Sequence, residues 1–276
     1  MAKQKQKLYV APQAQIYTLY RDMLNAGHLL IAGAQGSGKS TVMTGLIHTA
    51  VCNYPASAQL VIIDGKRVDY CEYRNMPHIV AYATERDDII SVMNGVIGIM
   101  ERRYKEMAEQ GLKEYEGRQM YIIIDELADL LTDRAYKRQF SPLLQRITQL
   151  GRAAHITVIA ASQCVLASVI DTSIKCNFAS RLALRTATGQ DSRNIIGVKG
   201  AEMLPNPRTE GHADGIWRNG ADVTRWNNLP VYDEAERQRI IHHWTSDECI
   251  EKDPEEIEQR PPRRGFFAML FGRKSA

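Results

Sequence analysis

A glycine-rich turn between two apolar segments constrains this chain more than any other feature. The stretch His28–Thr41 reads HLLIAGAQGSGKST, a short apolar run followed by the turn and the start of an apolar-periodic helix. This is the G-x-x-x-x-G-K-[ST] pattern of a P-loop, in the strand–loop–helix context that the motif requires. Glycines let backbone N–H groups approach phosphate oxygens, and the helix N-terminus adds positive potential there. The stretch therefore predicts a nucleotide-phosphate site in an α/β fold.

The residues of this loop are expected to contribute in two ways. Lys39 is expected to reach the β- and γ-phosphates, and the hydroxyl of Ser40 is expected to ligate Mg²⁺. The other members form the backbone cradle, and they are Gly33, Ala34, Gln35, Gly36, Ser37, Gly38 and Thr41. The loop thus predicts ATP and Mg²⁺ as the ligands.

A second apolar run, Met120–Ile124, ends in the acids Asp125 and Glu126. A strand that is apolar on both faces belongs inside a parallel sheet, whose carboxyl edge binds ligands. Downstream of a P-loop this is a Walker B pattern. Asp125 is expected to hold the Mg²⁺ water shell, and Glu126 to orient or deprotonate the attacking water. Gln163 follows the next predicted strand, His155–Ala161, and is expected to sense the γ-phosphate or to position water.

Strands and helices alternate along the chain, which favours a doubly wound, mostly parallel sheet with helices on both faces. Residues 1–22 are expected to form an N-terminal arm, residues 23–245 the ATPase domain, and residues 246–276 a flexible tail. The predicted helices are Ile16–Met23, Arg86–Gln110, Leu143–Leu150, Val165–Lys175 and Asp233–Thr245; the further strands are Ala58–Asp64, Ile79–Ala83 and Phe178–Leu184; a hairpin joins Gly215–Arg218 to Val223–Trp226. The hairpin and last helix form a C-terminal elaboration of the sheet.

Charge and hydropathy limit the class of protein. The net charge of +3 over 276 residues permits a nucleic-acid partner without arguing for one. No apolar run is long enough to span a bilayer and no signal peptide begins the chain, so we expect a cytoplasmic protein. The stretch Arg260–Lys274 brackets apolar residues with cations, a pattern typical of a peptide at an anionic membrane surface or in a partner's groove. It predicts a peripheral contact at the inner face of the membrane; the alternative is a tail that is disordered or folds back on the domain.

A set of short strings extends the likeness beyond the two nucleotide motifs. They are His28–Thr41, Ile62–Lys66, Met76–His78, Met100–Lys105, Asp125–Leu130, Gly151–Ile156, Ala161–Gln163, Arg181–Ala183, Asp191–Arg193 and Gly200–Leu204. In this order, from about residue 24 to about 245, they resemble the motor domain of the FtsK/SpoIIIE family of DNA translocases. The resemblance implies a RecA-like P-loop ATPase that forms a homohexameric ring, with nucleotide between neighbouring subunits and double-stranded DNA in the central channel.

The resemblance also implies two sets of cationic residues. A neighbouring subunit must supply a cation that offsets charge on the γ-phosphate. Arg181 is the first candidate for this trans finger, and Arg152 and Arg193 are alternatives. DNA contacts must be sequence-independent phosphate contacts. The candidates are Lys137 and Arg138 in a predicted loop over Asp133–Ser141, and Arg185 and Lys199 around the segment Thr186–Gly200.

The chain departs from the family pattern in two strings. It has Asp64-Gly65-Lys66 where Asp-Pro-Lys is usual, and Ser162-Gln163-Cys164-Val165 where Thr-Gln-Arg-Pro is usual. It also has no transmembrane helices, linker or winged-helix domain of the division proteins. The sequence is therefore more similar to motors of conjugative or mobilisable elements, for which a relaxase or a transfer channel is the expected partner. Two alternatives stay open: a type VII secretion-like ATPase that moves protein, and a non-motor NTP-binding switch that docks a relaxase or replication protein.

Overall fold

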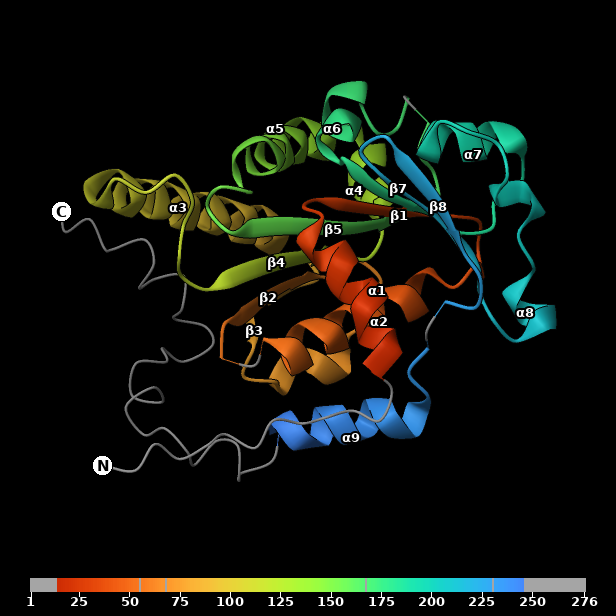
Figure 1. The fold of residues 1–276 in the computed structure, drawn as a ribbon. Helices are drawn as coiled ribbons and strands as arrows, with labels where there is room; N and C mark the ends of the chain where they lie inside the picture. The colour runs from red at the N-terminus through yellow and green to blue at the C-terminus, as the bar shows by residue number, and fades with distance from the viewer. Residues whose placement is uncertain (1–13, 55, 68, 167, 230, 246–276) are drawn as a thin grey trace.

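A sheet with eight strands lies between two layers of helices (Figure 1). The computed structural model describes residues 14–54, 56–67, 69–166, 168–229 and 231–245, and it describes side chains from residue 18 onward. The first part of the predicted N-terminal arm and the whole predicted tail, with its membrane pattern, lie outside the described residues. Within them, no helix combines the length and the apolar character needed to cross a membrane.

The helices and strands alternate along most of the chain, as the sequence predicts. In order they are α1 (Ala14–Asn25), β1 (Leu29–Ala32), α2 (Lys39–Asn53), β2 (Ala58–Ile63), η1 (Cys71–Asn75), β3 (Ile79–Ala83), α3 (Arg86–Gln110), β4 (Gln119–Ile124), α4 (Leu127–Thr132), α5 (Arg134–Leu150), β5 (Ile156–Ser162), α6 (Thr172–Asn177), β6 (Ser180–Ala183), α7 (Gly189–Ile196), η2 (Ala201–Met203), α8 (Pro207–Glu210), β7 (Gly215–Asn219), β8 (Asp222–Trp226) and α9 (Glu234–Thr245).

The strand order is β3-β2-β4-β5-β1-β6-β7-β8. Strands β1 to β6 pair in parallel, and the hairpin β7–β8 adds antiparallel strands at the β6 edge. The predicted doubly wound, mostly parallel sheet and its hairpin elaboration are therefore confirmed. Each parallel neighbour directs its carboxyl end to the same edge, which fixes where a ligand can bind.

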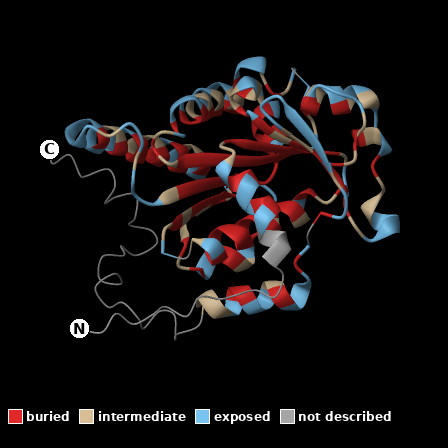
Figure 2. Cartoon of the chain, in the orientation of Figure 1, coloured by how far each residue is buried: buried red, intermediate tan, exposed pale blue. Residues whose placement is uncertain are grey.

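Each face of the sheet has its own apolar core. Leu29 and Ile31 of β1 pack with the core that contains α1, α2 and α9, whereas Leu30 and Ala32 pack with the core of α3, α5, α6 and α7. Both β1 and β5 are buried along their whole length, as the red strands of Figure 2 show. Burying one such aliphatic side chain stabilises the fold by about 1.5–3 kcal/mol. The central strands are thus the rigid support of the carboxyl edge.

Helix α1 is part of this core. Tyr20 and Met23 are fully buried and pack in the same cluster as Met43 and Leu46 of α2. The boundary that the sequence places after residue 22 falls inside this helix. The helix therefore anchors the P-loop helix from below the sheet.

The predicted loop over Asp133–Ser141 is wrong, because these residues belong mostly to α5. The side chain of Asp133 caps the helix by accepting a hydrogen bond from the backbone N–H of Tyr136 at 2.9 Å. The helix then continues through Pro142, which removes one backbone donor without ending it. Packing of Phe140 and Leu144 in the core supports the helix on both sides of the proline.

The predicted helix over Val165–Lys175 is wrong for its first part. Helical structure begins only at Thr172, and the preceding residues form turns and irregular backbone. Val165 and Ile170 are each buried in the core from this irregular segment. Because these apolar residues are buried from irregular backbone, their spacing resembles the apolar face of a helix although the described residues there form no helix.

Candidate nucleotide site

The site lies where the carboxyl ends of β1, β4 and β5 meet. Gly33 follows β1, Asp125 follows β4, and Ser162 ends β5. The backbone N–H of Gly33 donates to the carbonyl of Ser162 at 3.4 Å, so the P-loop leaves the sheet directly beside β5. The predicted strand–loop–helix context of the P-loop and the predicted position of the β4 acids are thus both present.

The P-loop has the backbone conformation that its glycines allow. Gly36 and Gly38 have φ angles of +75° and +97°, in the left-handed region that other residues avoid. Gly38 occupies the N-cap of α2, and its carbonyl accepts the first helical hydrogen bond from Val42 at 3.0 Å. The hydroxyl of Ser37 is buried without a hydrogen-bond partner in the part of the chain that the structure describes. The loop therefore offers a cradle and an unsatisfied polar atom to an anionic ligand.

Lys39 folds back over this cradle. Its Nζ donates to the carbonyls of Gly33 at 2.9 Å and Ala34 at 3.0 Å. Burial lowers the pKa of Lys39, and the nearby charge of Glu126 opposes part of this shift. An ammonium group that is held across the loop in this way is placed to bind phosphate oxygens.

The two acids of the Walker B pattern are buried and held differently. Asp125 is 3% exposed and Glu126 is 6% exposed. Oε1 of Glu126 accepts a hydrogen bond from the backbone N–H of Gln163 at 2.9 Å and lies 3.1 Å from Oγ of Ser162. Oε2 of Glu126 has no hydrogen-bond partner among the described residues. One oxygen therefore orients the carboxylate and the other is available to a water or a proton.

The carboxylate of Asp125 faces a cationic and a phenolic group of the segment after β2. Nζ of Lys66 lies 2.9 Å from Oδ2, and the hydroxyl of Tyr70 donates to Oδ1 at 3.3 Å. Burial raises the pKa of Asp125, and the hydrogen bond and charge of Lys66 oppose this shift. Asp125 therefore has the position expected of a Mg²⁺-side acid.

These observations fit Mg²⁺ and a nucleoside triphosphate. The glycine cradle and Lys39 suit the phosphates. Ser40, in the first turn of α2, offers a hydroxyl, and Asp125 offers a carboxylate, the hard oxygens that Mg²⁺ prefers. Ser40 is exposed at the mouth of the loop. The residues present can thus hold both ligands that the sequence predicts.

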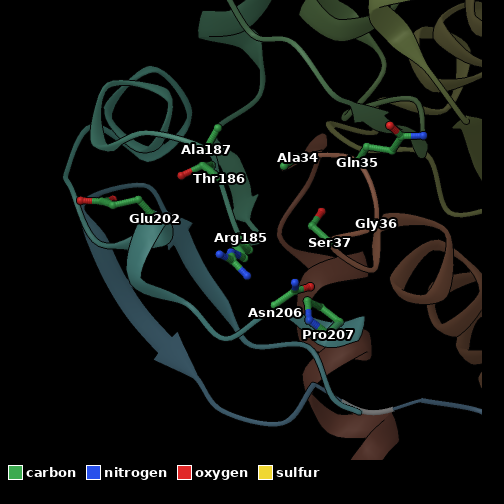
Figure 3. A pocket seen from close by; sticks show the side chains of 10 residues that line it. All are labelled: Ala34, Gln35, Gly36, Ser37, Arg185, Thr186, Ala187, Glu202, Asn206 and Pro207. Carbon is green, nitrogen blue, oxygen red and sulfur yellow. The ribbon is translucent and has the colours of Figure 1, made fainter. Parts of the chain in front are cut away.

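A cavity of about 270 Å³ adjoins the P-loop (Figure 3). Arg185 projects between Glu202 on one side and Ser37 and Asn206 on the other, as the labelled side chains show. The cavity is lined by Ala34, Gln35, Gly36, Ser37, Arg185, Thr186, Ala187, Glu202, Asn206 and Pro207. Arg185, predicted to contact DNA, lies beside the phosphate loop.

Sequence reasoning missed Arg208. The guanidinium of this residue lies over the P-loop, since a Cβ atom built at Gly36 would fall 2.6 Å from Nε of Arg208. Arg208 belongs to the short helix α8, which Asn206 caps through a hydrogen bond from the backbone N–H of Arg208 at 3.2 Å. The Asn-Pro string could have predicted this turn, but no local signal connects it to a loop so distant in sequence.

Arg181, the first candidate for a trans finger, is used within its own subunit. Its guanidinium donates to the carbonyls of Lys175 at 2.9 Å, Phe178 at 2.9 Å and Ile195 at 3.2 Å. Burial, and then the charge of Arg218, lower the pKa of Arg181. A side chain that bonds three carbonyls in this way is a structural clamp, and its geometry speaks against a finger role.

The other candidate cations differ in exposure. Arg152 and Arg193 are exposed, as are Arg138 and Lys199. Lys137 is half-buried, because its Nζ donates to the carbonyl of Val169 and to Oδ1 of Asp171, each at 2.9 Å. It therefore lies on α5, outside the predicted loop, and pairs with Asp171 at the start of α6.

Comparison with known proteins gives the family. The FtsK/SpoIIIE family model matches residues 7–120. The DNA translocase FtsK of Staphylococcus epidermidis is 35% identical over 198 residues, which are 64% of this chain and 25% of that protein. The DNA translocase FtsK of Oceanobacillus iheyensis is 32% identical over 248 residues, 82% of this chain and 30% of that protein. The chain thus spans less than a third of the length of these relatives.

Solved structures show the same fold. The pCW3 conjugation coupling protein TcpA, in its monomer form with ATPγS, superposes with a TM-score of 0.69 at 23% identity, over 80% of this chain and 66% of that one. The cytoplasmic domain of the Thermomonospora curvata type VII secretion ATPase EccC gives 0.65 at 21% identity, over 79% of this chain and 28% of that one. The family-model match and the curated relatives identify an FtsK/SpoIIIE family domain in this chain.

Proposed function

We propose that this chain hydrolyses ATP and uses the reaction to move along double-stranded DNA. The observation that carries the proposal is the Glu126 carboxylate, buried at the same sheet edge as Lys39 and bonded through only one of its oxygens. Such a group is placed to activate water beside a bound phosphate chain. Support for DNA as the track comes from the relatives named DNA translocase FtsK.

Each residue of the site has a separable role in this reaction. When bound, Mg·ATP supplies the γ-phosphoryl group and a divalent cation. Lys39 and the loop N–H groups bind the phosphates, and Ser40 and Asp125 hold the cation. Oε2 of Glu126 accepts the proton of the attacking water, while the N–H of Gln163 keeps the carboxylate turned toward it. The Gln163 side chain, exposed at the end of β5, is a candidate γ-phosphate sensor.

The assembly that this function needs is a homohexameric ring around DNA. A neighbouring subunit would supply the cation for the γ-phosphate, and the exposed Arg152 and Arg193 are the candidates that the fold leaves free of buried contacts. Exposed Arg138 and Lys199 are candidates for phosphate contacts with DNA. Such contacts would be insensitive to base sequence, as translocation requires.

The proposed biological role is DNA transfer or mobilisation of a plasmid or integrative element. Its support is the resemblance to motors of such elements and the fold shared with a conjugation coupling protein. We place the protein in the cytoplasm, with a relaxase or a transfer channel as partner and a peripheral membrane contact through residues 260–274. The fold is also shared with a type VII secretion ATPase. The alternative that an experiment must distinguish is therefore a motor that moves protein and not DNA.

The experiment is steady-state ATP hydrolysis with and without linear double-stranded DNA. We expect DNA of any sequence to stimulate turnover, and we expect the stimulation to fall as salt rises because phosphate contacts release counterions. Glu126→Gln protein is the control that binds ATP and barely turns over. Stimulation by a secretion-signal peptide and not by DNA would favour the protein-moving alternative.

A further inference from the structure

The turn after β2 is built around the buried carboxylate of Asp64. Oδ1 of Asp64 accepts a hydrogen bond from the backbone N–H of Arg67 at 2.9 Å, and Oδ2 accepts one from the hydroxyl of Tyr82 at 2.7 Å and one from the N–H of Tyr70 at 3.4 Å. Arg67 has a φ angle of +70°, which a non-glycine residue adopts only when its surroundings enforce it. These contacts hold the described residues of the turn in place, among them Lys66 and Tyr70.

Two groups of this segment contact Asp125. Nζ of Lys66 lies 2.9 Å from Oδ2, and the hydroxyl of Tyr70 donates to Oδ1 at 3.3 Å. Asp125 is almost fully buried, whereas the Lys66 side chain is 37% exposed. The Lys66 ammonium is thus the cation that faces this buried carboxylate.

Lys66 lies at the carboxylate that the proposed function assigns to the Mg²⁺ side of the site. A buried carboxylate requires a counter-charge, and Lys66 supplies it. Two cations cannot share that position, because they repel each other where the local dielectric is low. Lys66 has a second anion within reach, since Asp69 lies 3.7 Å from Nζ and is itself partly exposed. The flexible lysine stem allows the ammonium to move between the two carboxylates.

We propose that Lys66 is a positioning residue that holds Asp125 and competes with Mg²⁺ for its carboxylate, turning to Asp69 when the cation binds. The inference rests on the proposed function, because that function assigns Asp125 to the Mg²⁺ side of the site. Lys66 thereby keeps the acid in place without metal and sets the Mg²⁺ concentration at which nucleotide is bound tightly.

The test compares Lys66→Met with wild type and with two controls. Lys66→Arg keeps the positive charge, and Arg67→Met removes a charge of the same turn whose partner is the exposed Glu85. ATPγS binding is measured by calorimetry over a range of Mg²⁺ concentrations, and thermal unfolding is measured in EDTA without nucleotide. The unfolding measurement also reports whether each variant folds.

We expect Lys66→Met to lower the Mg²⁺ concentration that gives half-maximal ATPγS binding by about fivefold or more. The reason is that the Lys66 ammonium and Mg²⁺ exclude each other from Asp125. In EDTA the midpoint of unfolding of this variant should fall, because Asp125 then lacks a counter-charge. Lys66→Arg should resemble wild type in EDTA, and Arg67→Met should resemble wild type in both measurements.

Two results would overturn the inference. One is an unchanged or higher Mg²⁺ midpoint in Lys66→Met protein that still binds ATPγS. The other is an unchanged unfolding midpoint in EDTA. Neither of these two measurements depends on DNA. The proposed function fails separately if the protein binds ATPγS but DNA does not stimulate its ATP hydrolysis. Failure of wild type to bind ATPγS would overturn both proposals.

Discussion

The backbone N–H of Gln163 donates to Oε1 of Glu126 at 2.9 Å, which links the end of β5 to the second acid after β4. Ser162 adds its hydroxyl oxygen at 3.1 Å from the same atom. The second oxygen of Glu126 is buried without a hydrogen-bond partner among the described residues. Pairing of β4 with β5 brings these two residues together. The contact occupies Oε1 and leaves Oε2 as the oxygen that can act on water.

Replacing Glu126 by Gln should separate binding from turnover. The amide keeps the shape of the side chain but cannot accept a proton, so turnover should fall by about 10²- to 10⁴-fold. ATPγS affinity should change little, because Lys39 and the loop hold the phosphates. Asp129→Asn, on the exposed side of α4, is the matched control and should turn over like wild type. Normal turnover in Glu126→Gln would exclude this residue as the base.

Removing the Arg208 guanidinium should weaken nucleotide binding. It lies over Gly36, where phosphate oxygens are expected, and a hydrogen bond to a charged group contributes about 1.5–3 kcal/mol. Arg208→Met should therefore lower the affinity for ATPγS about tenfold or more at saturating Mg²⁺. Arg239→Met, on the exposed side of α9, is the control. Equal affinities of the two variants would leave Arg208 as a packing residue.

Replacing Arg181 should reduce stability and not the catalytic step. The side chain bonds three carbonyls at the ends of α6 and α7, so Arg181→Met should lower the free energy of unfolding by about 2 kcal/mol. Turnover per folded molecule at low temperature should stay near that of wild type. Denaturant unfolding and ATP hydrolysis measured on the same preparation decide the matter. A fully stable but inactive variant would restore the finger assignment.

The trans finger can then be found by mixing inactive proteins. Lys39→Ala protein lacks a working P-loop but keeps its arginines. Mixed with an inactive finger variant, it should restore part of the activity at hybrid interfaces. We expect recovery for either Arg152→Ala or Arg193→Ala, both of which change exposed side chains. Recovery for neither variant would contradict a site completed between subunits by these residues.

Stability should decrease with acid because of His48. This residue is fully buried 3.0 Å from the Tyr73 hydroxyl, and burial, with a smaller effect of Arg237, lowers its pKa to about 3. Below pH 6.5 the unfolded chain binds a proton that the folded chain does not. The stabilisation that His48 contributes is therefore fully present above pH 6.5 and is lost as pH falls toward 3. About 2 kcal/mol of the free energy of unfolding is lost between pH 6.5 and 5.

Denaturant unfolding at several pH values checks this. His48→Gln should be less stable than wild type at pH 7.5 but should lose less stability between pH 6.5 and 5, because glutamine does not titrate. His242→Gln, on the exposed side of α9, should keep the wild-type slope. Equal slopes for wild type and His48→Gln would contradict the argument.

The sequence predicts those parts of the site that local pattern encodes. The P-loop and the acids after β4 each require a strand, a turn and particular residues within one short stretch, and the parallel sheet brings them together. Contacts between distant segments carry no such signal. Arg208 reaches Gly36 only because β6 inserts beside β1. Arg181 becomes a clamp only because the ends of α6 and α7 converge on it.

Helix α5 shows the same limit for the fold. A proline after a polar stretch predicts a loop, but Phe140 and Leu144 are fully buried on either side of Pro142 and hold the helix together. Tertiary packing outweighs local preference at this position. Lys137, predicted to lie in a loop, lies on α5 instead and forms an ion pair with Asp171.

The central claim is movement along double-stranded DNA, and displacement of a triplex-forming oligonucleotide tests it most directly. A labelled third strand is bound far from the entry point on a linear duplex, and its release is followed after ATP is added. We expect release by wild type that lags in proportion to the distance travelled and is absent with Glu126→Gln protein or with ATPγS. Hydrolysis of ATP without release of the third strand, on duplexes of every length, would contradict the account.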